Sequence, residues 1–192
     1  AFMIDWKELS NEIRQAMPDL KILDEEPLAR HMSFRIGGPA AIFAQPATVD
    51  ELSKLLRFLA ARGISLRILG AGTNVLAPDE GLREVVICTK DALTGLCDLG
   101  GGKIEAFAGE TLSKTAVFAR NLSLTGLEFA HGIPGTVGGG IYMNAGAYGG
   151  EMKQVAMETM VLTMDGETQV FAGEAQGFSY RTSAFEKLPV II

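Results

Sequence analysis

Glycine is concentrated in one stretch of the chain: nine of the twenty-five residues from 126 to 150 are glycine (GLEFAHGIPGTVGGGIYMNAGAYGG). Glycine has no Cβ, so it adopts positive φ freely and lets a ligand lie directly against main-chain N–H groups. Each glycine also costs conformational entropy on folding, and a purely structural loop gains nothing in return. We therefore expect this stretch to face a ligand. The candidate contacts are Gly132, Ile133, Pro134, Gly135, Thr136, Gly138, Gly139, Gly140, Asn144, Gly146, Ala147 and Tyr148.

A second glycine-containing segment, LGAGTNVL, occupies residues 69–76 at the end of an apolar run. Successive N–H groups in such a turn form a concave, positively polarised nest that suits a diphosphate, and two side chains add donors. The segment is neither a Walker loop nor a Rossmann fingerprint, because no Gly-Lys-Ser/Thr follows and no GxGxxG opens a helix. A plain tight turn is the alternative. The candidate contacts are Leu69, Gly70, Ala71, Gly72, Thr73, Asn74, Val75 and Leu76. Two such loops together suggest a phosphate-bearing cofactor held largely by backbone.

The totals exclude several classes of protein. The chain has 192 residues, enough for one large domain or two small lobes with a buried core. A net charge of −6 without a basic cluster argues against a nucleic-acid partner. No apolar stretch approaches the ~18 residues that cross a bilayer, and no signal peptide opens the chain, so we expect no membrane insertion. Cys88 and Cys97 are too few for a disulfide framework, which favours a cytoplasmic setting. His31 and His131 lack a carboxylate partner at ligand spacing, so we predict structural histidines and no metal site.

The first half of the chain predicts alternating helices and strands that would position the segment at 69–76. The expected elements are a helix capped by Asp5 and ended by Pro18, strands at 31–36 and 41–44, a helix capped by Thr48 and closed by Gly63, and strands at 66–69 and 85–88. The helix capped by Thr48 and the strand at 66–69 are interpreted as part of a β-α-β unit, and the first glycine loop follows the last strand of this unit. The acidic run at 24–26 is interpreted as a surface turn before Pro27.

The second half carries the longer glycine stretch between a helix and a hairpin. The expected elements are a strand at 104–108, a helix at 111–121, two strands at 157–164 and 167–171 across the turn Asp165-Gly166, and an irregular polar segment at 178–185. The chain therefore reads as an α+β protein of two lobes, residues 1–95 and 96–192. The boundary falls near 91–102, and each lobe presents one glycine loop to the cleft.

Both ends of the sequence suggest a piece of a longer protein. Met3-Ile4-Asp5 resembles a native start, so Ala1 and Phe2 would be left over from expression. The last residues, 188–192, form the apolar run LPVII with strand character, whereas ordinary termini are polar and frayed. We therefore expect that a strand is interrupted there and that more chain follows in the natural protein.

Two further strings, HMSFRIGG at 31–38 and GFSYRTSAF at 177–185, make the pattern specific. Together with LGAGTNVL and GLEFAHGIPGTVGGGIYMNAGAYGGE, in this order and spacing, they resemble the UDP-N-acetylenolpyruvoylglucosamine reductase family over nearly the whole chain. The resemblance implies a two-lobed FAD-binding domain of the vanillyl-alcohol-oxidase/PCMH type. The diphosphate would lie on residues 70–74, and residues 132–140 with 144–148 would line the rest of the flavin. The first loop offers neither histidine nor cysteine, so the FAD is expected to be non-covalent.

The same resemblance implies a reaction and two residues for it. In the family, NADPH reduces FAD, and a hydride then passes to the enolpyruvyl double bond of UDP-N-acetylglucosamine enolpyruvate, a small-molecule substrate. Arg181 matches the family's catalytic arginine, and its planar charge suits a carboxylate on which negative charge develops. Tyr180 matches a substrate-contacting tyrosine. Without the motif, such an arginine would be read as a solvated surface charge.

The match also stops short of the whole family pattern. The family's proton-donor serine and assisting glutamate lie in a C-terminal substrate lobe that this sequence lacks, and Ser183 is no substitute for that serine. We therefore expect FAD binding without a completed turnover. Two other functions stay open: a flavin oxidase of the same superfamily, and a non-catalytic flavin-binding module, which a stop codon directly after Ile192 would favour. The sequence does not define the oligomeric state.

Overall fold

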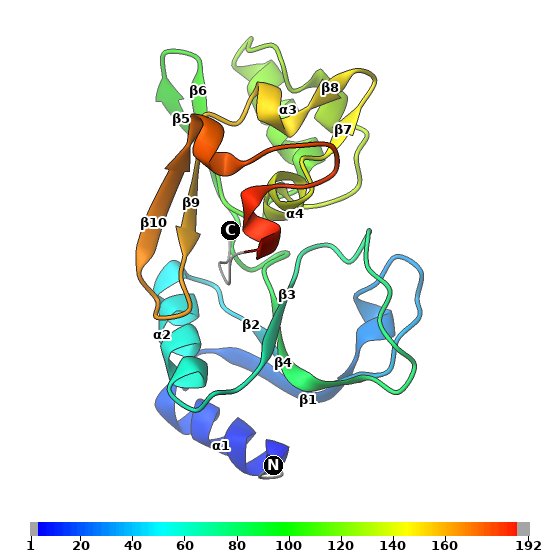
Figure 1. The fold of residues 1–192 in the computed structure, drawn as a ribbon, viewed down its shortest axis with the longest axis vertical. Coiled ribbons are helices and arrows are strands. Elements are labelled where there is room, and N and C mark those ends of the chain that lie inside the picture. The colour runs from blue at the N-terminus through cyan, green and yellow to red at the C-terminus, as the bar shows by residue number, and fades with distance from the viewer. Residues whose placement is uncertain (1–3, 188–192) are drawn as a thin grey trace.

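The computed structural model describes residues 4–187, and its two halves follow one another along the chain (Figure 1). The first half, at the bottom of Figure 1, contains α1 (Trp6–Ala16), β1 (Lys21–Pro27), β2 (Pro39–Gln45), α2 (Val49–Ala60), β3 (Leu66–Leu69) and β4 (Leu82–Cys88). The second half contains β5 (Leu96–Gly100), β6 (Lys103–Ala106), α3 (Leu112–Asn121), α4 (Val137–Tyr142), β7 (Gly146–Ala147), β8 (Gly150–Glu151), β9 (Glu158–Leu162) and β10 (Thr168–Ala172). Five short 3-10 turns, η1 to η5, connect or end these elements. The mixture confirms the predicted α+β class.

The first half is built on one four-stranded sheet of order β1-β2-β4-β3. Strands β2, β4 and β3 run parallel, and β1 is antiparallel to β2 at the edge. The central strands β2 and β4 are buried over their apolar runs, residues 40–44 and 85–88. Helices α1 and α2 pack their apolar residues against one face of the sheet. The β2-α2-β3 unit is confirmed, with β4 inserted between its two strands.

The helix boundaries follow their predicted caps. The Asp5 carboxylate accepts hydrogen bonds from the N–H groups of Lys7 and Glu8, and α1 ends before Pro18 as expected. The Thr48 hydroxyl accepts from the N–H of Glu51 at 3.1 Å at the start of α2. An N-cap of this kind contributes about 1 kcal/mol because it satisfies a donor that the helix itself leaves free.

Two expectations in the first half are wrong. The acidic run at 24–26 lies in the edge strand β1 rather than in a turn, and ion pairs from Arg14 and Arg83 neutralise two of its carboxylates. An edge strand tolerates such charges because one side faces solvent. The segment at 31–36 is not a strand but a series of turns after η1 (Leu28–Arg30), with Arg35 at φ 55°. Its backbone instead packs against Gly72 of the first glycine loop.

The second half carries three small two-stranded sheets: β5-β6, β7-β8 and β9-β10. The hairpin β9-β10 turns at Asp165-Gly166 as predicted. The helix expected at 111–121 is α3, which starts one residue later because Thr111 is its N-cap. The sequence did not predict β5, because its largely exposed residues carry no apolar alternation. The expected strand at 104–108 is confirmed in shorter form as β6.

The long glycine stretch was expected to be loop throughout, but residues 137–142 form the short helix α4. Thr136 caps this helix, and a Cβ on Gly140 would lie 3.1 Å from the Leu112 side chain of α3. Glycine at this position therefore permits close packing of α4 on α3. In the segment at 178–185, Ser179 and Thr182 form an isolated β-bridge, and η5 (Ala184–Lys187) follows. The strand expected at 188–192 lies outside the described residues.

The β9-β10 hairpin of the second half reaches down beside α2 of the first (Figure 1). The Ser53 hydroxyl on α2 donates a hydrogen bond to the Gly166 carbonyl oxygen at 2.9 Å. Leu162 of β9 is buried in the same cluster as Leu55 and Leu56 of α2. None of the helices within residues 4–187 has the length and apolar character needed to span a bilayer.

Candidate functional site

The first glycine loop leaves β3 with its backbone donors free. Leu69 is buried at the end of the strand, and its carbonyl oxygen accepts from the N–H of Thr89. Among the described residues, none accepts a hydrogen bond from the N–H groups of residues 70–77. A run of unpaired N–H groups in a turn concentrates positive partial charge, which is the condition for binding a diphosphate. This arrangement favours the nest interpretation over a plain turn.

The two alternating glycines of this loop are required by neighbouring parts of the protein. A Cβ on Gly70 would lie 2.4 Å from the Thr136 hydroxyl, and one on Gly72 would lie 2.1 Å from the His31 carbonyl oxygen. Gly72 also has φ +63°, and its carbonyl oxygen accepts from the N–H of Ser33. The loop is therefore pressed between the 31–33 segment on one side and the second glycine stretch on the other.

The two glycine loops contact each other directly, which the sequence did not predict. The Thr73 hydroxyl donates to the Pro134 carbonyl oxygen at 2.8 Å, so it serves the protein rather than standing free for a ligand. In the second loop, a Cβ on Gly132 would meet nothing within 4 Å, and one on Gly135 would meet only the Thr73 hydroxyl at 3.6 Å. No internal packing requires glycine at these two positions, so they stay the strongest candidates for approach by a ligand.

The glycines on α4 have a different environment. The N–H of Gly138 donates to Ala108, and the N–H of Gly140 donates to Thr136. The N–H of Gly139 donates to the Thr136 hydroxyl at 3.4 Å. These three N–H groups are therefore used within the protein. Any cofactor contact at residues 138–140 would have to use the bare Cα surface.

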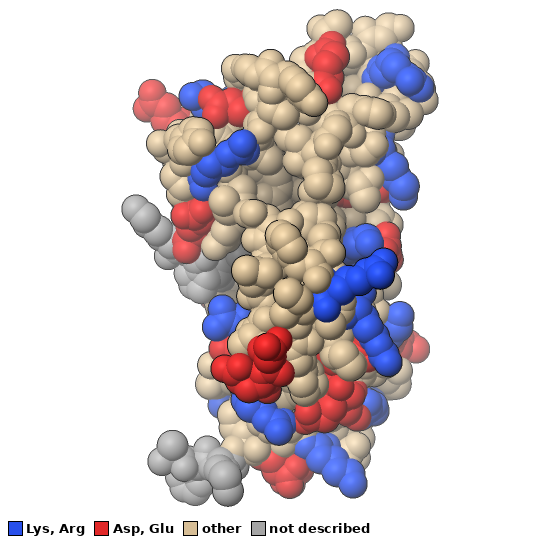
Figure 2. All heavy atoms as spheres, turned by 90° about the vertical axis from the view of Figure 1, so that its right-hand side faces the viewer, with Lys and Arg blue, Asp and Glu red and all other residues tan. Residues whose placement is uncertain are grey.

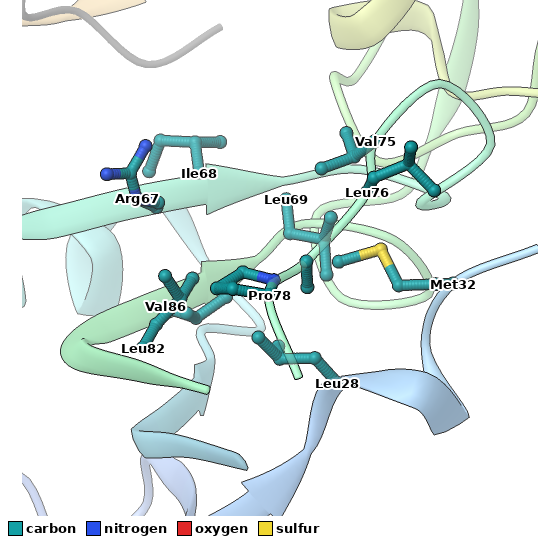
Figure 3. A pocket seen from close by; sticks show the side chains of 11 residues that line it. Leu28, Met32, Arg67, Ile68, Leu69, Val75, Leu76, Pro78, Leu82 and Val86 are labelled. Carbon is teal, nitrogen blue, oxygen red and sulfur yellow. The ribbon is translucent and has the colours of Figure 1, made fainter. Parts of the chain in front are cut away.

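An apolar cavity of about 310 Å³ lies beside the first loop (Figure 3). Val75 and Leu76 of the loop line it together with Pro78, and so do Leu28, Met32, Leu82 and Val86 (Figure 3). Arg67 is the charged residue among those that line it. The cavity thus offers apolar contact next to a row of free N–H groups. That combination suits a ligand with a flat or apolar part joined to a phosphate.

Arg181 and Tyr180 meet the Asn144–Tyr148 part of the second glycine stretch in a separate pocket of about 300 Å³. The Arg181 guanidinium donates to the Gly146 carbonyl oxygen at 3.1 Å and lies near the Tyr180 ring. The Tyr148 and Tyr180 side chains are open to solvent, with exposed fractions of 97% and 85%. The structure thus brings together sequence-predicted residues that are more than thirty positions apart. On the face in Figure 2, uncharged side chains fill the centre, and Lys and Arg side chains lie along its right-hand edge.

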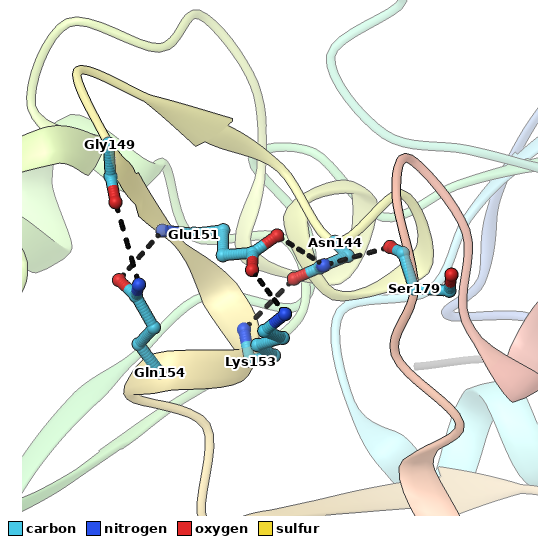
Figure 4. A network of polar contacts seen from close by, with 6 residues as sticks. All are labelled: Asn144, Gly149, Glu151, Lys153, Gln154 and Ser179. Carbon is cyan, nitrogen blue, oxygen red and sulfur yellow. Dashed lines mark hydrogen bonds and ion pairs between the residues drawn. The ribbon is translucent and has the colours of Figure 1, made fainter.

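Asn144 lies at the base of this pocket and is 1% exposed. Its side-chain amide donates to Glu151 at 2.8 Å and to the Ser179 carbonyl oxygen at 2.9 Å, and it accepts from the N–H of Lys153 at 2.9 Å (Figure 4). We expected Asn144 to contact the cofactor, but both amide hydrogens and the oxygen have protein partners.

Sequence reasoning missed Glu151 and Lys153. The Lys153 ammonium pairs with the Glu151 carboxylate at 2.6 Å. Hydrogen bonding by Lys153 lowers the pKa of Glu151, with further lowering by the charge of Lys153, the Asn144 amide and the charge of Arg181. A signal was present in the sequence: Glu151-x-x-Gln154 is a capping-box spacing, and the structure forms that box at η3 (Met152–Gln154).

The structure gives His31 a structural environment. Its Nε2 shares a hydrogen bond with the Glu26 carboxylate at 3.0 Å, and its ring stacks on Phe43 with centroids 4.1 Å apart. Within residues 4–187, no group of three or more His, Cys, Asp or Glu side chains is placed to hold a metal ion.

The fold, the nest of free N–H groups and the adjoining glycine-lined surface define a flavin-binding protein. Residues 40–172 match the family model described as FAD binding domain, so the chain belongs to the FAD binding domain family. The 6-hydroxy-D-nicotine oxidase from Arthrobacter nicotinovorans shares the fold, with a TM-score of 0.65 over 86% of this chain and 41% of that chain, at 14% identity. With p-cresol methylhydroxylase also among the structural neighbours, the fold is the two-lobed vanillyl-alcohol-oxidase/PCMH type that the resemblance implied.

Closer similarity is to one group of enzymes. The chain is 41% identical over 184 residues to the UDP-N-acetylenolpyruvoylglucosamine reductase of Caldanaerobacter subterraneus subsp. tengcongensis. The aligned region covers 96% of this chain and 60% of that relative. The crystal structure of UDP-N-acetylenolpyruvylglucosamine reductase from Thermus caldophilus matches 85% of this chain and 56% of that chain. Its identity is 32% and its TM-score 0.66. The chain spans about 60% of the length of the curated relatives it matches.

Proposed function

We propose that this chain is the FAD-binding part of an NADPH-dependent UDP-N-acetylenolpyruvoylglucosamine reductase. The whole enzyme would convert UDP-N-acetylglucosamine enolpyruvate to UDP-N-acetylmuramate in peptidoglycan precursor synthesis. One observation carries the proposal: the pocket that joins Arg181 and Tyr180 to the Asn144–Tyr148 segment. Similarity to the reductases over 96% of the chain supports the same activity.

The residues of the two loops fit a non-covalent FAD. The free N–H groups of residues 70–77 would hold the diphosphate, and the unobstructed surfaces at Gly132 and Gly135 would lie against the rest of the cofactor. Residues 69–76 contain no histidine or cysteine that could attach the flavin covalently. When bound, FAD would supply the redox chemistry for hydride transfer between NADPH and the enolpyruvyl double bond.

Arg181 would stabilise the negative charge that develops on the substrate carboxylate during reduction. Its guanidinium has five donors in a planar fork, and one of them is used by Gly146. A fixed cation aimed at developing charge is among the largest contributions that a protein makes to such a step. Tyr180, exposed beside it, would contact the substrate.

Ser183 does not supply the proton in this scheme. It is 3% exposed, and its hydroxyl donates to the Tyr142 carbonyl oxygen at 2.7 Å. A hydroxyl that is buried and committed to a backbone oxygen is poorly placed to protonate a ligand. The arrangement supports assigning the proton donor outside these residues.

We place the reaction in the cytoplasm, in keeping with the two free thiols of Cys88 and Cys97. NADPH would be the co-substrate, and no nucleic acid or membrane partner is proposed.

The test begins with flavin uptake. The purified chain mixed with FAD should retain a flavin spectrum after gel filtration and release free FAD on denaturation. Addition of UDP-N-acetylglucosamine enolpyruvate should perturb that spectrum, and Arg181→Met should weaken the apparent affinity at least tenfold while FAD binding persists. A colourless protein that takes up no added FAD would count against the proposal, as would a substrate response that Arg181→Met leaves unchanged.

A further inference from the structure

The turn at 179–182, which carries Arg181, makes two hydrogen bonds to the second glycine stretch, and the adjoining Ser183 hydroxyl donates a third to the Tyr142 carbonyl oxygen. The backbone of the turn is closed by hydrogen bonds between Ser179 and Thr182, and Arg181 itself adopts φ 55°, which is unusual for a residue other than glycine. The first attachment is the Asn144 amide, which donates to the Ser179 carbonyl oxygen at 2.9 Å (Figure 4). The second is the Arg181 guanidinium, which donates to the Gly146 carbonyl oxygen at 3.1 Å.

The Asn144 amide can adopt only one orientation in this network. Its oxygen must face the N–H of Lys153, and its nitrogen must face the two acceptors, Glu151 and the Ser179 carbonyl oxygen. A flipped amide would oppose donor to donor on one side and acceptor to acceptor on the other. Asn144 is also held at φ 42°, a left-handed conformation that asparagine tolerates better than most residues. Burial at 1% exposure keeps water from replacing these bonds.

We propose that Asn144 is a positioning residue, which fixes the 179–182 turn so that Arg181 points into the pocket with Tyr148 and Tyr180. Glu151 and Lys153 orient the amide, and the amide in turn orients the arginine. This inference rests on the proposed function for the role of Arg181 toward substrate. The hydrogen bonds of Asn144 are observed in the structure and do not depend on that function.

The consequence is that Asn144 affects the substrate without touching it. A backbone strained at Arg181 needs surroundings that over-determine its conformation, and the Asn144 bond is the one that holds the start of the turn. Loss of that bond should let the 178–183 segment open more often and spread the guanidinium over several positions. A mobile guanidinium binds a carboxylate more weakly than a fixed one, because its conformational entropy is lost when the carboxylate binds.

The decisive variant is Asn144→Asp, which keeps size and acceptor oxygens but lacks both donors. This substitution also places a second carboxylate beside Glu151, and the two negative charges would repel each other. The double variant Asn144→Asp/Glu151→Gln removes that repulsion but still lacks the amide donors, so it shows which of the two effects is responsible. Gln176→Glu is the matched control. Gln176 is likewise 1% exposed, and its amide donates to the carbonyl oxygens of Ala156 and Met157 rather than to the turn.

Two measurements on the FAD-loaded protein test the proposal. The first is amide hydrogen exchange of residues 178–183, which does not depend on substrate. Both Asn144 variants should raise exchange there at least tenfold relative to the wild type, whereas Gln176→Glu, compared at matched thermal stability, should change it less than threefold. The second is the apparent affinity for UDP-N-acetylglucosamine enolpyruvate from flavin absorbance, which should weaken at least tenfold in the Asn144 variants only.

The outcomes separate the two proposals. Unchanged exchange at 178–183 in both Asn144 variants would overturn the positioning role, as would full recovery in the double variant. Equal loss of affinity in Gln176→Glu would do the same, because it would reduce the effect to general destabilisation. If the wild type shows no substrate response but the exchange pattern appears, the proposed function fails while the attachment of the turn by Asn144 is supported.

Discussion

The Thr73 hydroxyl donates a hydrogen bond to the Pro134 carbonyl oxygen at 2.8 Å, across 61 positions of sequence. This bond joins the two glycine loops, one from each half of the chain. Both loops would have to keep a fixed separation to bind one extended cofactor. The Thr73 side chain therefore contributes to the site through geometry.

Thr73→Val removes the hydroxyl and nearly preserves the shape of the side chain. The free energy of unfolding should fall by about 1 kcal/mol, the ordinary net contribution of one hydrogen bond. Affinity for FAD should fall as well, because the loops are no longer held together. Calorimetry with and without FAD measures both quantities. Thr73→Ser keeps the donor and should bind FAD like the wild type. Normal FAD affinity in Thr73→Val would contradict a role in loop spacing.

Two glycine substitutions should separate packing from ligand approach. In Gly70→Ala the new Cβ would lie 2.4 Å from the Thr136 hydroxyl, so stability should fall by about 1–3 kcal/mol. In Gly132→Ala the Cβ meets nothing within 4 Å, so stability should stay within about 0.5 kcal/mol. FAD affinity should nevertheless drop severalfold in Gly132→Ala, because the methyl group occupies the proposed contact surface. Denaturant titration and FAD titration provide the two numbers. Unaltered FAD binding by Gly132→Ala would show that the surface at Gly132 does not contact the cofactor.

Ser53→Ala tests the contact between α2 and the β9-β10 hairpin. The hydroxyl donates to the Gly166 carbonyl oxygen and accepts from Arg57, and the residue is buried. We expect a loss of about 1–2 kcal/mol in urea unfolding, because a buried acceptor loses its donor. FAD affinity should be unchanged, since neither loop is involved. Lys54→Ala is the neighbouring control: it removes an exposed ion pair with Asp50 and should leave the urea unfolding midpoint nearly unchanged. Equal effects of the two variants would argue against the hairpin contact.

The sequence predicted the elements whose signals are local. Caps at Asp5 and Thr48, and the turn at Asp165-Gly166, each act within a few residues, and the structure forms all three. Both glycine loops also carry a local signal, because their glycines lie close together in the sequence.

The features that the sequence did not predict depend on distant partners. The 31–36 segment has strand-like residues, but it must pass Gly72 of a loop that comes more than thirty positions later. Helix α4 carries three consecutive glycines, and tertiary contacts such as Gly140 against Leu112 override their poor helix propensity. The role of Asn144 was hidden for the same reason, because Ser179 is 35 positions away.

Acid should weaken the network around Glu151. The pKa of Glu151 in the folded protein is lowered, chiefly by hydrogen bonding from Lys153, from its ordinary 4.5. The unfolded chain therefore binds a proton more readily than the folded one, so the contribution to stability is fully present above about pH 4.5 and is lost as pH falls through the folded pKa. The stability difference between the wild type and Glu151→Gln should shrink over that range. Urea titrations from pH 7 to pH 3 measure it, and a difference that grows on acidification would contradict the sign.

The two cysteines should differ sharply in reactivity. Burial raises the pKa of the Cys88 thiol, and the Cys88 sulfur lies 3.7 Å from the Gly70 carbonyl oxygen behind the first glycine loop. Cys97 is exposed on β5. Because the thiolate is the nucleophile, iodoacetamide at pH 7.5 should modify Cys97 first and reach Cys88 only when the first half of the chain opens. In a Cys97→Ser variant, labelling of Cys88 by mass spectrometry then reports that opening, and added FAD should slow it because a ligand bound only by the folded state suppresses opening. Rapid labelling of Cys88 in the folded protein, or a rate that saturating FAD leaves unchanged, would contradict the placement of the first loop over this thiol.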